Sequence, residues 1–128
     1  MKRVTGIGGI FLTSPDPTTL RAWYQRHLGI DVQVWGGAAF SWAEGAKGPD
    51  VGTTIWSVTD AKPDAFAPST APFMVNYRVA DLHTLVKVLR EEGCNVLEEV
   101  SDSEYGIFGW VIDPDGNKVE LWQPPAGQ

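Results

Sequence analysis

The chain repeats one order of secondary-structure signals, and this repeat constrains its fold more than any other feature. A strand-like run over residues 4–13 leads to an aspartate that can cap a helix, an amphipathic segment and a closing glycine; the same order returns in the second half. The capping residues Asp16 and Asp81 lie 65 positions apart, and the closing glycines Gly29 and Gly93 lie 64 apart. Aspartate favours helix starts and glycine favours helix ends. The spacing therefore predicts two similar units.

Each unit continues with β-prone runs separated by turn residues. In the first half these runs are Asp31–Trp35, Ala38–Ala43 and Val51–Thr59, and in the second half they are residues 95–100, 105–113 and 118–122. We predict an α+β fold of two βαβββ modules in a single domain. The expected boundaries are about 4–59 for module one, about 60–72 for a linker and about 73–124 for module two.

The two helical segments carry apolar stripes that should cover the outer faces of the sheets. The stripes are Leu20, Trp23, Tyr24, His27 and Leu28, and then Leu82, Leu85, Val86 and Leu89. Their spacing fits a 3.6-residue period. The inner faces must then meet something else, so two curved sheets side by side are expected to form a cup.

A carboxylate in the closing segment, Asp113–Trp122, is the first candidate for a functional group. After the turn Asp-Pro-Asp-Gly-Asn, the chain alternates, so that Val119 and Leu121 share one face of a strand while Glu120 and Trp122 share the other. Inside a sheet, Glu120 would require a metal, a cation or a polar ligand. The alternative is that this face is simply solvated.

Composition excludes some partners. The net charge of -6 argues against nucleic-acid binding, which needs clustered cations. No run approaches the roughly 18 apolar residues of a membrane span, and the N-terminus lacks the apolar block of a signal peptide. We predict a cytoplasmic protein without a membrane partner. Cys94 is the single cysteine and cannot form an internal disulfide.

Three segments together resemble the vicinal oxygen chelate superfamily, which includes glyoxalase I, bleomycin-resistance proteins and extradiol dioxygenases. They are GGIFLTSPDPTTLRAWYQRHLGI, NYRVADLHTLVKVLREEGCNV and YGIFGWVIDPDGNKVELWQP. The ending DPDGN-x-x-EL, placed after a D-x-x-x-L helix, is the more specific part. The resemblance implies a half-open, cup-shaped eight-stranded barrel, commonly completed as a homodimer.

The same resemblance places a divalent metal between four side chains, one from the first and one from the fourth strand of each module. In this chain those positions read Gly9, Trp56 or its neighbour Ile55, Met74 and Glu120. Three of the four are poor ligands for zinc, nickel or iron. The two histidines lie in the helical segments. We therefore predict no cofactor, with a divalent metal at Glu120 as the minority alternative.

Without a metal, the inward positions suggest a pocket for an organic ligand, because they combine large apolar walls with a few polar groups. The expected ligand-binding residues are Phe11, Thr54, Trp56, Met74, Asn76, Arg78, Tyr105, Trp110 and Trp122. Tyr105 is expected at the rim, and Trp110 lines either the cup or a dimer seam. Any of these aromatic residues could instead belong to the core.

Two roles remain open for Glu120. An ion pair with Arg78 on the same face would neutralise it, which we favour, or it acts as a catalytic base with a raised pKa. Three functions follow. The first is a metal-free protein that binds an amphipathic or aromatic small molecule. The second is a glyoxalase- or dioxygenase-like enzyme, a lyase, isomerase or dioxygenase that uses Glu120 as base or metal ligand. The third is an interaction module.

Overall fold

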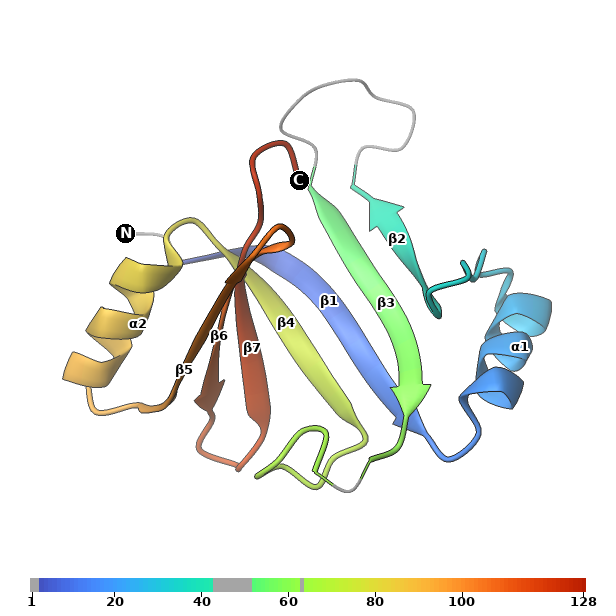
Figure 1. The fold of residues 1–128 in the computed structure, drawn as a ribbon, viewed down its shortest axis with the longest axis horizontal. Helices are drawn as coiled ribbons and strands as arrows, with labels where there is room; N and C mark the ends of the chain where they lie inside the picture. The colour runs from blue at the N-terminus through green and yellow to red at the C-terminus, as the bar shows by residue number, and fades with distance from the viewer. Residues whose placement is uncertain (1–2, 43–51, 63) are drawn as a thin grey trace.

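The computed structural model describes residues 3–42, 52–62 and 64–128 of the chain, and in these it has seven strands and two helices (Figure 1). The elements in chain order are β1 (Val4–Ser14), α1 (Pro17–Leu28), β2 (Gly37–Ser41), β3 (Thr53–Asp60), β4 (Phe73–Val79), α2 (Leu82–Glu91), β5 (Asn95–Ser103), β6 (Gly106–Ile112) and β7 (Lys118–Gln123).

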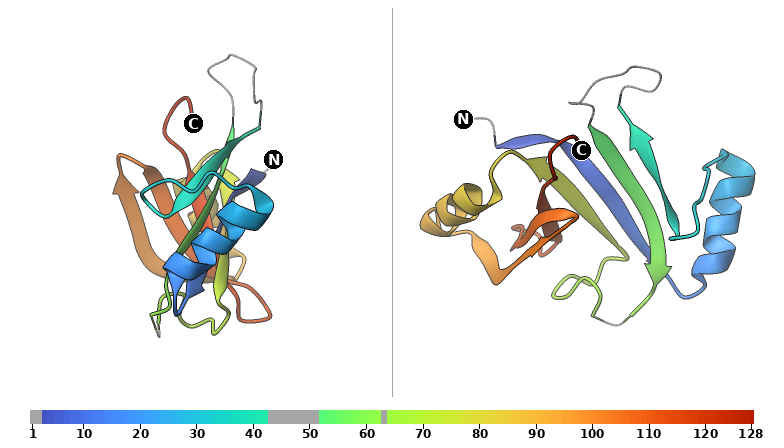
Figure 2. Two further views of the ribbon diagram at one scale, coloured as in Figure 1. Left: turned by 90° about the vertical axis from the view of Figure 1, so that its right-hand side faces the viewer. Right: turned by 45° about the horizontal axis from the view of Figure 1, so that its top comes forward.

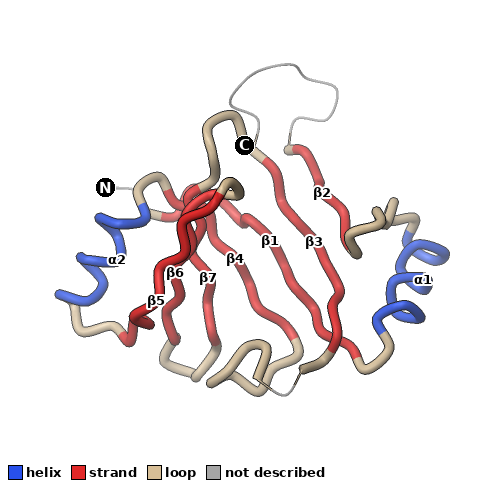
Figure 3. The backbone as a smooth tube through the Cα atoms, in the orientation of Figure 1, coloured by secondary structure: helices blue, strands red, loops and turns tan. Residues whose placement is uncertain are grey.

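All seven strands form one mixed sheet in the order β2-β3-β1-β4-β7-β6-β5. The first strands of the two halves, β1 and β4, pair antiparallel at its centre. Each then pairs in parallel with the last strand of its own half, β1 with β3 and β4 with β7. The sheet curves and stays open between helices at its two ends (Figures 2 and 3). This confirms the predicted α+β fold and its cup-shaped sheet.

The structure differs from the prediction in one strand, so that the sheet has seven strands in the described residues rather than eight. Residues 31–35, expected as a strand, form irregular chain and a turn. The Gln33 N–H donates to the Gly37 carbonyl at 2.8 Å, and the side chain of Val34 is fully exposed. The ends of two other predicted strands, Ala43 and Val51, lie outside the described residues.

The core lies between α2 and the outer face of the second half of the sheet. Its buried residues are Val79, Leu82, Leu85, Val86 and Leu121. Side chains from β4 to β7 surround them, and Leu89 completes the predicted stripe of α2. Because Leu121 faces this core, its neighbour Glu120 must point to the opposite, concave face.

The first helix is attached to the sheet differently. The structure describes every residue of α1 and none of them is buried, with Trp23 and Leu28 about half exposed or more. Its predicted stripe therefore covers the sheet only in part. Arg21 fixes the helix to β3, because its Nε donates to the Val58 carbonyl at 2.9 Å. The Tyr24 ring also meets the Trp56 ring, with centroids 5.0 Å apart.

Both helices begin at the predicted caps. The carboxylates of Asp16 and Asp81 each accept from the backbone N–H three residues later, at 3.2 Å in both cases. Gly29 ends α1 in the left-handed region with a φ of 68°, which glycine adopts without strain. No helix in the described part of the chain is long and apolar enough to cross a membrane.

Candidate functional site

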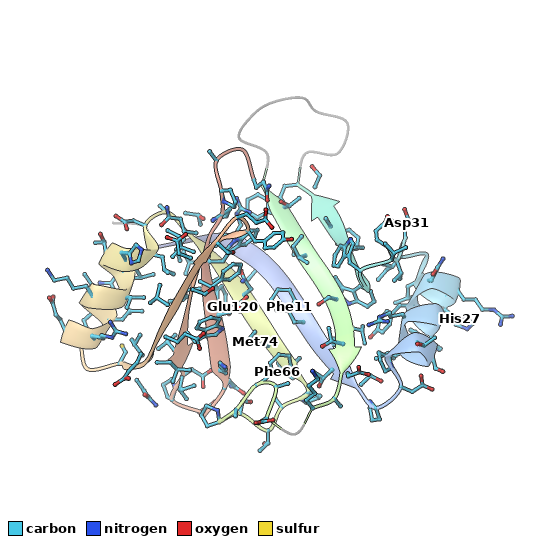
Figure 4. The ribbon with its side chains drawn as sticks, viewed as in Figure 1. Phe11, His27, Asp31, Phe66, Met74 and Glu120 are labelled. Atoms are coloured by element: carbon cyan, nitrogen blue, oxygen red, sulfur yellow. The ribbon has the colours of Figure 1, made fainter. Side chains whose placement is uncertain are left out.

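A cavity of about 240 Å³ lies on the concave face of the sheet. Its walls are mostly apolar and come from both halves of the chain, with a few polar groups among them. The lining residues are Gly8, Phe11, Thr53, Ile55, Asn76, Tyr105, Phe108, Trp122 and Gln128. Figure 4 labels Phe11, Met74 and Glu120 near the middle of the sheet, with Phe66 from the β3–β4 connection below them in this view.

Glu120 is buried on this concave face, with 8% of its surface exposed. Two donors hold its carboxylate: Asn76 Nδ2 donates to Oε1 at 2.6 Å, and Trp110 Nε1 donates to Oε2 at 2.9 Å. Burial raises the pKa of Glu120, and the hydrogen bonds from Asn76 and Trp110 oppose this rise. The carboxylate thus lies beside Asn76 on the neighbouring strand, and Glu120 is not among the residues that line the cavity.

The expected ion pair between Arg78 and Glu120 is absent, so this prediction was wrong. In the sheet register Glu120 is opposite Asn76, whereas Arg78 is opposite Trp122. Arg78 donates instead to the main-chain oxygens of Gln128, at 2.6 Å, and Thr53, at 3.3 Å. Among the described residues, the only ion pair is that of Arg3 with Glu92.

The guanidinium of Arg78 is placed between two indole rings. Its central carbon lies 5.0 Å from the ring centroid of Trp42 and 5.2 Å from that of Trp122. Both rings thus present a face to the cation. The cation lines a second, larger hollow of about 640 Å³, which includes the segment from Gln123 to Gln128.

An irregularity in β1 lies at the cavity, because Gly8 within it is one of the lining residues. The pairing of β1 with β4 slips between Ile7 and Gly9. A Cβ at Gly8 would collide with Asn76 Oδ1, and a Cβ at Gly9 would lie 2.9 Å from the Phe11 ring. Glycines are therefore needed here for space, and larger residues would fill the floor of the cavity.

Four predicted ligand-binding residues line this cavity: Phe11, Asn76, Tyr105 and Trp122. Trp110 and Glu120 are not among the lining residues and form a hydrogen-bonded row with Asn76 across β6, β7 and β4. Met74 is buried on the same face, opposite Phe11 across the pairing of β1 with β4.

Two predicted placements were wrong. Trp56 faces α1 and packs on Tyr24, while its neighbour Ile55 lines the cavity. Thr54 does not line the cavity, because its hydroxyl accepts from Trp42 Nε1 and donates to the Ile7 carbonyl. The adjacent Thr53 lines it instead. Gly9 pairs with Ile55 as Asn76 pairs with Glu120, so Asn76 lies 67 positions after Gly9, and Glu120 lies 65 positions after Ile55. The spacing of 64 that placed Trp56 at the metal position was therefore one residue too short.

The register also changes the residues at the family's four metal positions. The neighbour of Glu120 on β4 is Asn76 rather than Met74. The four positions therefore read Gly9, Ile55, Asn76 and Glu120. Glycine and isoleucine supply no ligand, and both oxygens of Glu120 accept other hydrogen bonds. In the described residues, no three side chains of His, Cys, Asp or Glu gather. These residues do not fit the family's four-ligand metal site.

Sequence reasoning missed Thr53, Phe108 and Trp42. Phe108 stacks on Trp122, with centroids 6.1 Å apart and ring planes 11° apart. It could have been found, because Phe108 lies two residues before Trp110 on the same strand and so shares its face. The role of Trp42 depends on the path of the chain near β2, which no local pattern indicates.

Comparisons with known proteins agree with this fold. A family profile described as "Glyoxalase-like domain" matches residues 9–122. A search of curated proteins found no match. Among solved structures, methylmalonyl-CoA epimerase from Mycobacterium tuberculosis is similar, with a TM-score of 0.66 and 17% identity over 98% of this chain and 91% of that one.

Two further solved structures are similar to this chain in fold. Methylmalonyl-CoA epimerase in complex with methylmalonyl-CoA and NH4+ has a TM-score of 0.69 and 18% identity, covering 98% of each chain. A glyoxalase/bleomycin resistance protein/dioxygenase superfamily member from Vibrio splendidus 12B01 has a TM-score of 0.58 and 14% identity, over 91% of this chain and 97% of that one. At these identities the likeness concerns the fold. Since the family profile spans nearly the whole chain, the protein belongs to the glyoxalase-like domain family of the vicinal oxygen chelate superfamily.

Proposed function

We propose that the protein binds a small aromatic molecule in the 240 Å³ cavity, without the divalent metal of its superfamily. The observation that carries this is the composition of the walls: Phe11, Ile55, Phe108 and Trp122 surround a space into which few polar groups project. Organic-ligand sites have this composition. Their usual volume begins near 300 Å³, so a compound of one or two rings is the expected size.

A cavity-filling variant tests this proposal. Ile55→Phe should fill the space and abolish the binding of two-ring aromatic compounds, measured by calorimetry and by the ligand-induced rise in melting temperature. Trp56→Phe, on the opposite face of the same strand, is the matched control and should bind as the wild type does. Equal binding by Ile55→Phe and the wild type would place the ligand elsewhere.

The proposed independence from a metal has its own test. Gly9 and Ile55 occupy two of the family's four metal positions and offer no side-chain ligand. The remaining residues are too few for a tight divalent site. Metal analysis of protein purified without an affinity tag should find less than stoichiometric nickel, zinc, iron or manganese. A stoichiometric metal that Glu120→Gln removes would contradict the proposal.

A second candidate is an isomerase or lyase that uses Glu120 as a base. Its support is the burial of Glu120, which raises the pKa of this carboxyl group above its ordinary value. Epimerases among the structural neighbours have the same fold. Against it, Glu120 is buried, its two oxygens accept hydrogen bonds from Asn76 and Trp110, and it does not line the cavity. The test is whether the wild type catalyses exchange of substrate protons with deuterium in D2O. Exchange by the wild type that Glu120→Gln fails to catalyse would favour this candidate over simple binding.

We further propose that the chain forms a homodimer. Large apolar side chains are exposed on α1 and around β2, among them Trp23, Leu28, Trp35 and Phe40. Exposed apolar area of this kind commonly marks an interface. Sedimentation at micromolar concentration should give twice the monomer mass, and a monodisperse monomer would reject the proposal.

A further inference from the structure

The side-chain amide of Asn76 has one unused hydrogen-bonding atom. Asn76 is 1% exposed, and its Nδ2 donates to Glu120. Its Oδ1 is buried and has no partner within the part of the chain that the structure describes. This oxygen points toward Gly8, and both residues line the cavity. A buried acceptor without a donor is unfavourable, so a donor arriving with a ligand would be favoured.

The protein itself fixes the direction in which this amide points. Trp110, Glu120 and Asn76 lie side by side on β6, β7 and β4. The indole N–H of Trp110 can only donate, and the carboxylate of Glu120 can only accept above its folded-state pKa, where it is ionised. Glu120 therefore takes the N–H of Trp110 on one oxygen and requires the NH2 group of Asn76 on the other. The amide oxygen is thereby turned toward Gly8, which lines the cavity together with Asn76.

We propose that Asn76 selects ligands by hydrogen-bond polarity: the aromatic ligand carries an N–H or O–H group that donates to Asn76 Oδ1, and Glu120 and Trp110 are the positioning residues that hold the amide in this orientation. The inference rests on the proposed aromatic-binding function and defines the chemistry of its ligand. An aromatic compound that presents only an acceptor at this point would face the oxygen of Asn76 and bind poorly.

One substitution should reverse this selectivity. In Glu120→Gln, the Trp110 N–H still requires an acceptor, so the new amide must turn its oxygen toward Trp110 and its NH2 toward Asn76. Asn76 then satisfies that NH2 with Oδ1, and its own Nδ2 turns into the cavity. The floor of the cavity changes from acceptor to donor with almost no change in shape.

Three fused two-ring compounds of similar size separate the possibilities. Indole donates a hydrogen bond through its N–H, benzoxazole only accepts hydrogen bonds, and indene neither donates nor accepts them. Affinities are measured by calorimetry and corrected for the octanol–water partition of each compound. For the wild type, indole should bind about tenfold more tightly than the other two. For Glu120→Gln, benzoxazole should bind more tightly than indole. Glu98→Gln, an exposed change of the same charge, is the control and should keep the wild-type order.

Each outcome has a distinct meaning. If none of the three compounds binds the wild type, the proposed function fails and the inference fails with it. If all three bind the wild type equally, aromatic binding stands and selection by Asn76 is overturned. If indole is preferred by the wild type and equally by folded Glu120→Gln, the positioning role of Glu120 is wrong.

A second measurement does not depend on a variant. In the wild type, the Asn76 amide protons should show nuclear Overhauser contacts on the Trp110 side and none to the ring protons of bound indole. Contacts between those amide protons and the ligand would mean that the NH2 group faces the cavity, and would overturn the proposal even if Glu120→Gln did not fold.

Discussion

The guanidinium of Arg78 lies over the indole ring of Trp122, with its central carbon 5.2 Å from the ring centroid, and the two residues are opposite each other in the sheet. The same cation also lies over the indole ring of Trp42, with its central carbon 5.0 Å from that centroid. A planar cation between two aromatic faces holds both rings in position. The wall of the cavity thus depends on a residue that lies at its edge.

Arg78→Lys should lower the free energy of unfolding by about 1 kcal/mol, because lysine keeps the charge but loses the planar stacking and the paired donors. Urea denaturation followed by tryptophan fluorescence measures the change. Arg26→Lys, on the exposed surface of α1, is the control and should be close to neutral. An unchanged midpoint for Arg78→Lys would mean that the stacking contributes little.

Gly8→Ala should abolish aromatic binding and lower the free energy of unfolding by about 1–3 kcal/mol through overpacking. The new methyl group would collide with Asn76 Oδ1 and lie 2.9 Å from the Trp122 ring. Gly109→Ala is the comparison, because its methyl group would face Val86 at 3.3 Å on the α2 side of the sheet. It should affect stability but leave binding intact, as calorimetry with indole would show.

The stability of the wild type relative to Glu120→Gln should depend on pH. Burial raises the folded-state pKa of Glu120 above its ordinary value of 4.5. Between these two values the folded chain holds a proton that the unfolded chain has lost, so the wild-type free energy of unfolding falls as pH rises. Glutamine does not titrate. The free energy of unfolding of Glu120→Gln minus that of the wild type should therefore increase with pH from about 4.5. This difference should become constant above the raised pKa.

Urea denaturation of both proteins at several pH values measures this difference, and titrations elsewhere in the chain cancel. A difference that stays flat with pH would show that the carboxyl group is not perturbed.

The two helix caps should differ in effect although their geometry is nearly the same. Asp81→Ala removes the cap of α2, which contributes Leu82, Leu85 and Val86 to the core, so the denaturation midpoint of the whole protein should fall. Asp16→Ala removes the cap of α1, none of whose residues is buried. Its main effect should be faster hydrogen exchange in α1 alone. Equal losses of global stability would contradict this difference.

The sequence predicted the general fold because local and repeated signals agree with each other. Aspartate caps, closing glycines and the stripe of α2 are set by neighbouring residues. The run Asp31–Trp35 misled because β-prone residues form a strand only where a partner strand accepts their hydrogen bonds. There the chain turns back, and Val34 points into solvent.

The site was predicted less completely, because alternation gives the face of a residue but not its neighbour on the next strand. It placed Glu120 and Arg78 on the concave face, where both lie. It could not show that Asn76, rather than Arg78, is opposite Glu120. The slip of pairing in β1 also makes Asn76 rather than Met74 the equivalent of Gly9. Trp56 was one residue out of register, because its neighbour Ile55 lies 65 positions before Glu120.

The pairing of β1 with β4 makes the cavity a joint product of the two halves of the chain. Gly8 comes from the first half and Asn76 from the second, so neither half alone encloses the space. If the chain were cut between β3 and β4, two separate fragments would regain the cavity only by reassembling along this seam. A bound aromatic compound would then stabilise the association of the two fragments, and its binding would measure how far they had reassembled.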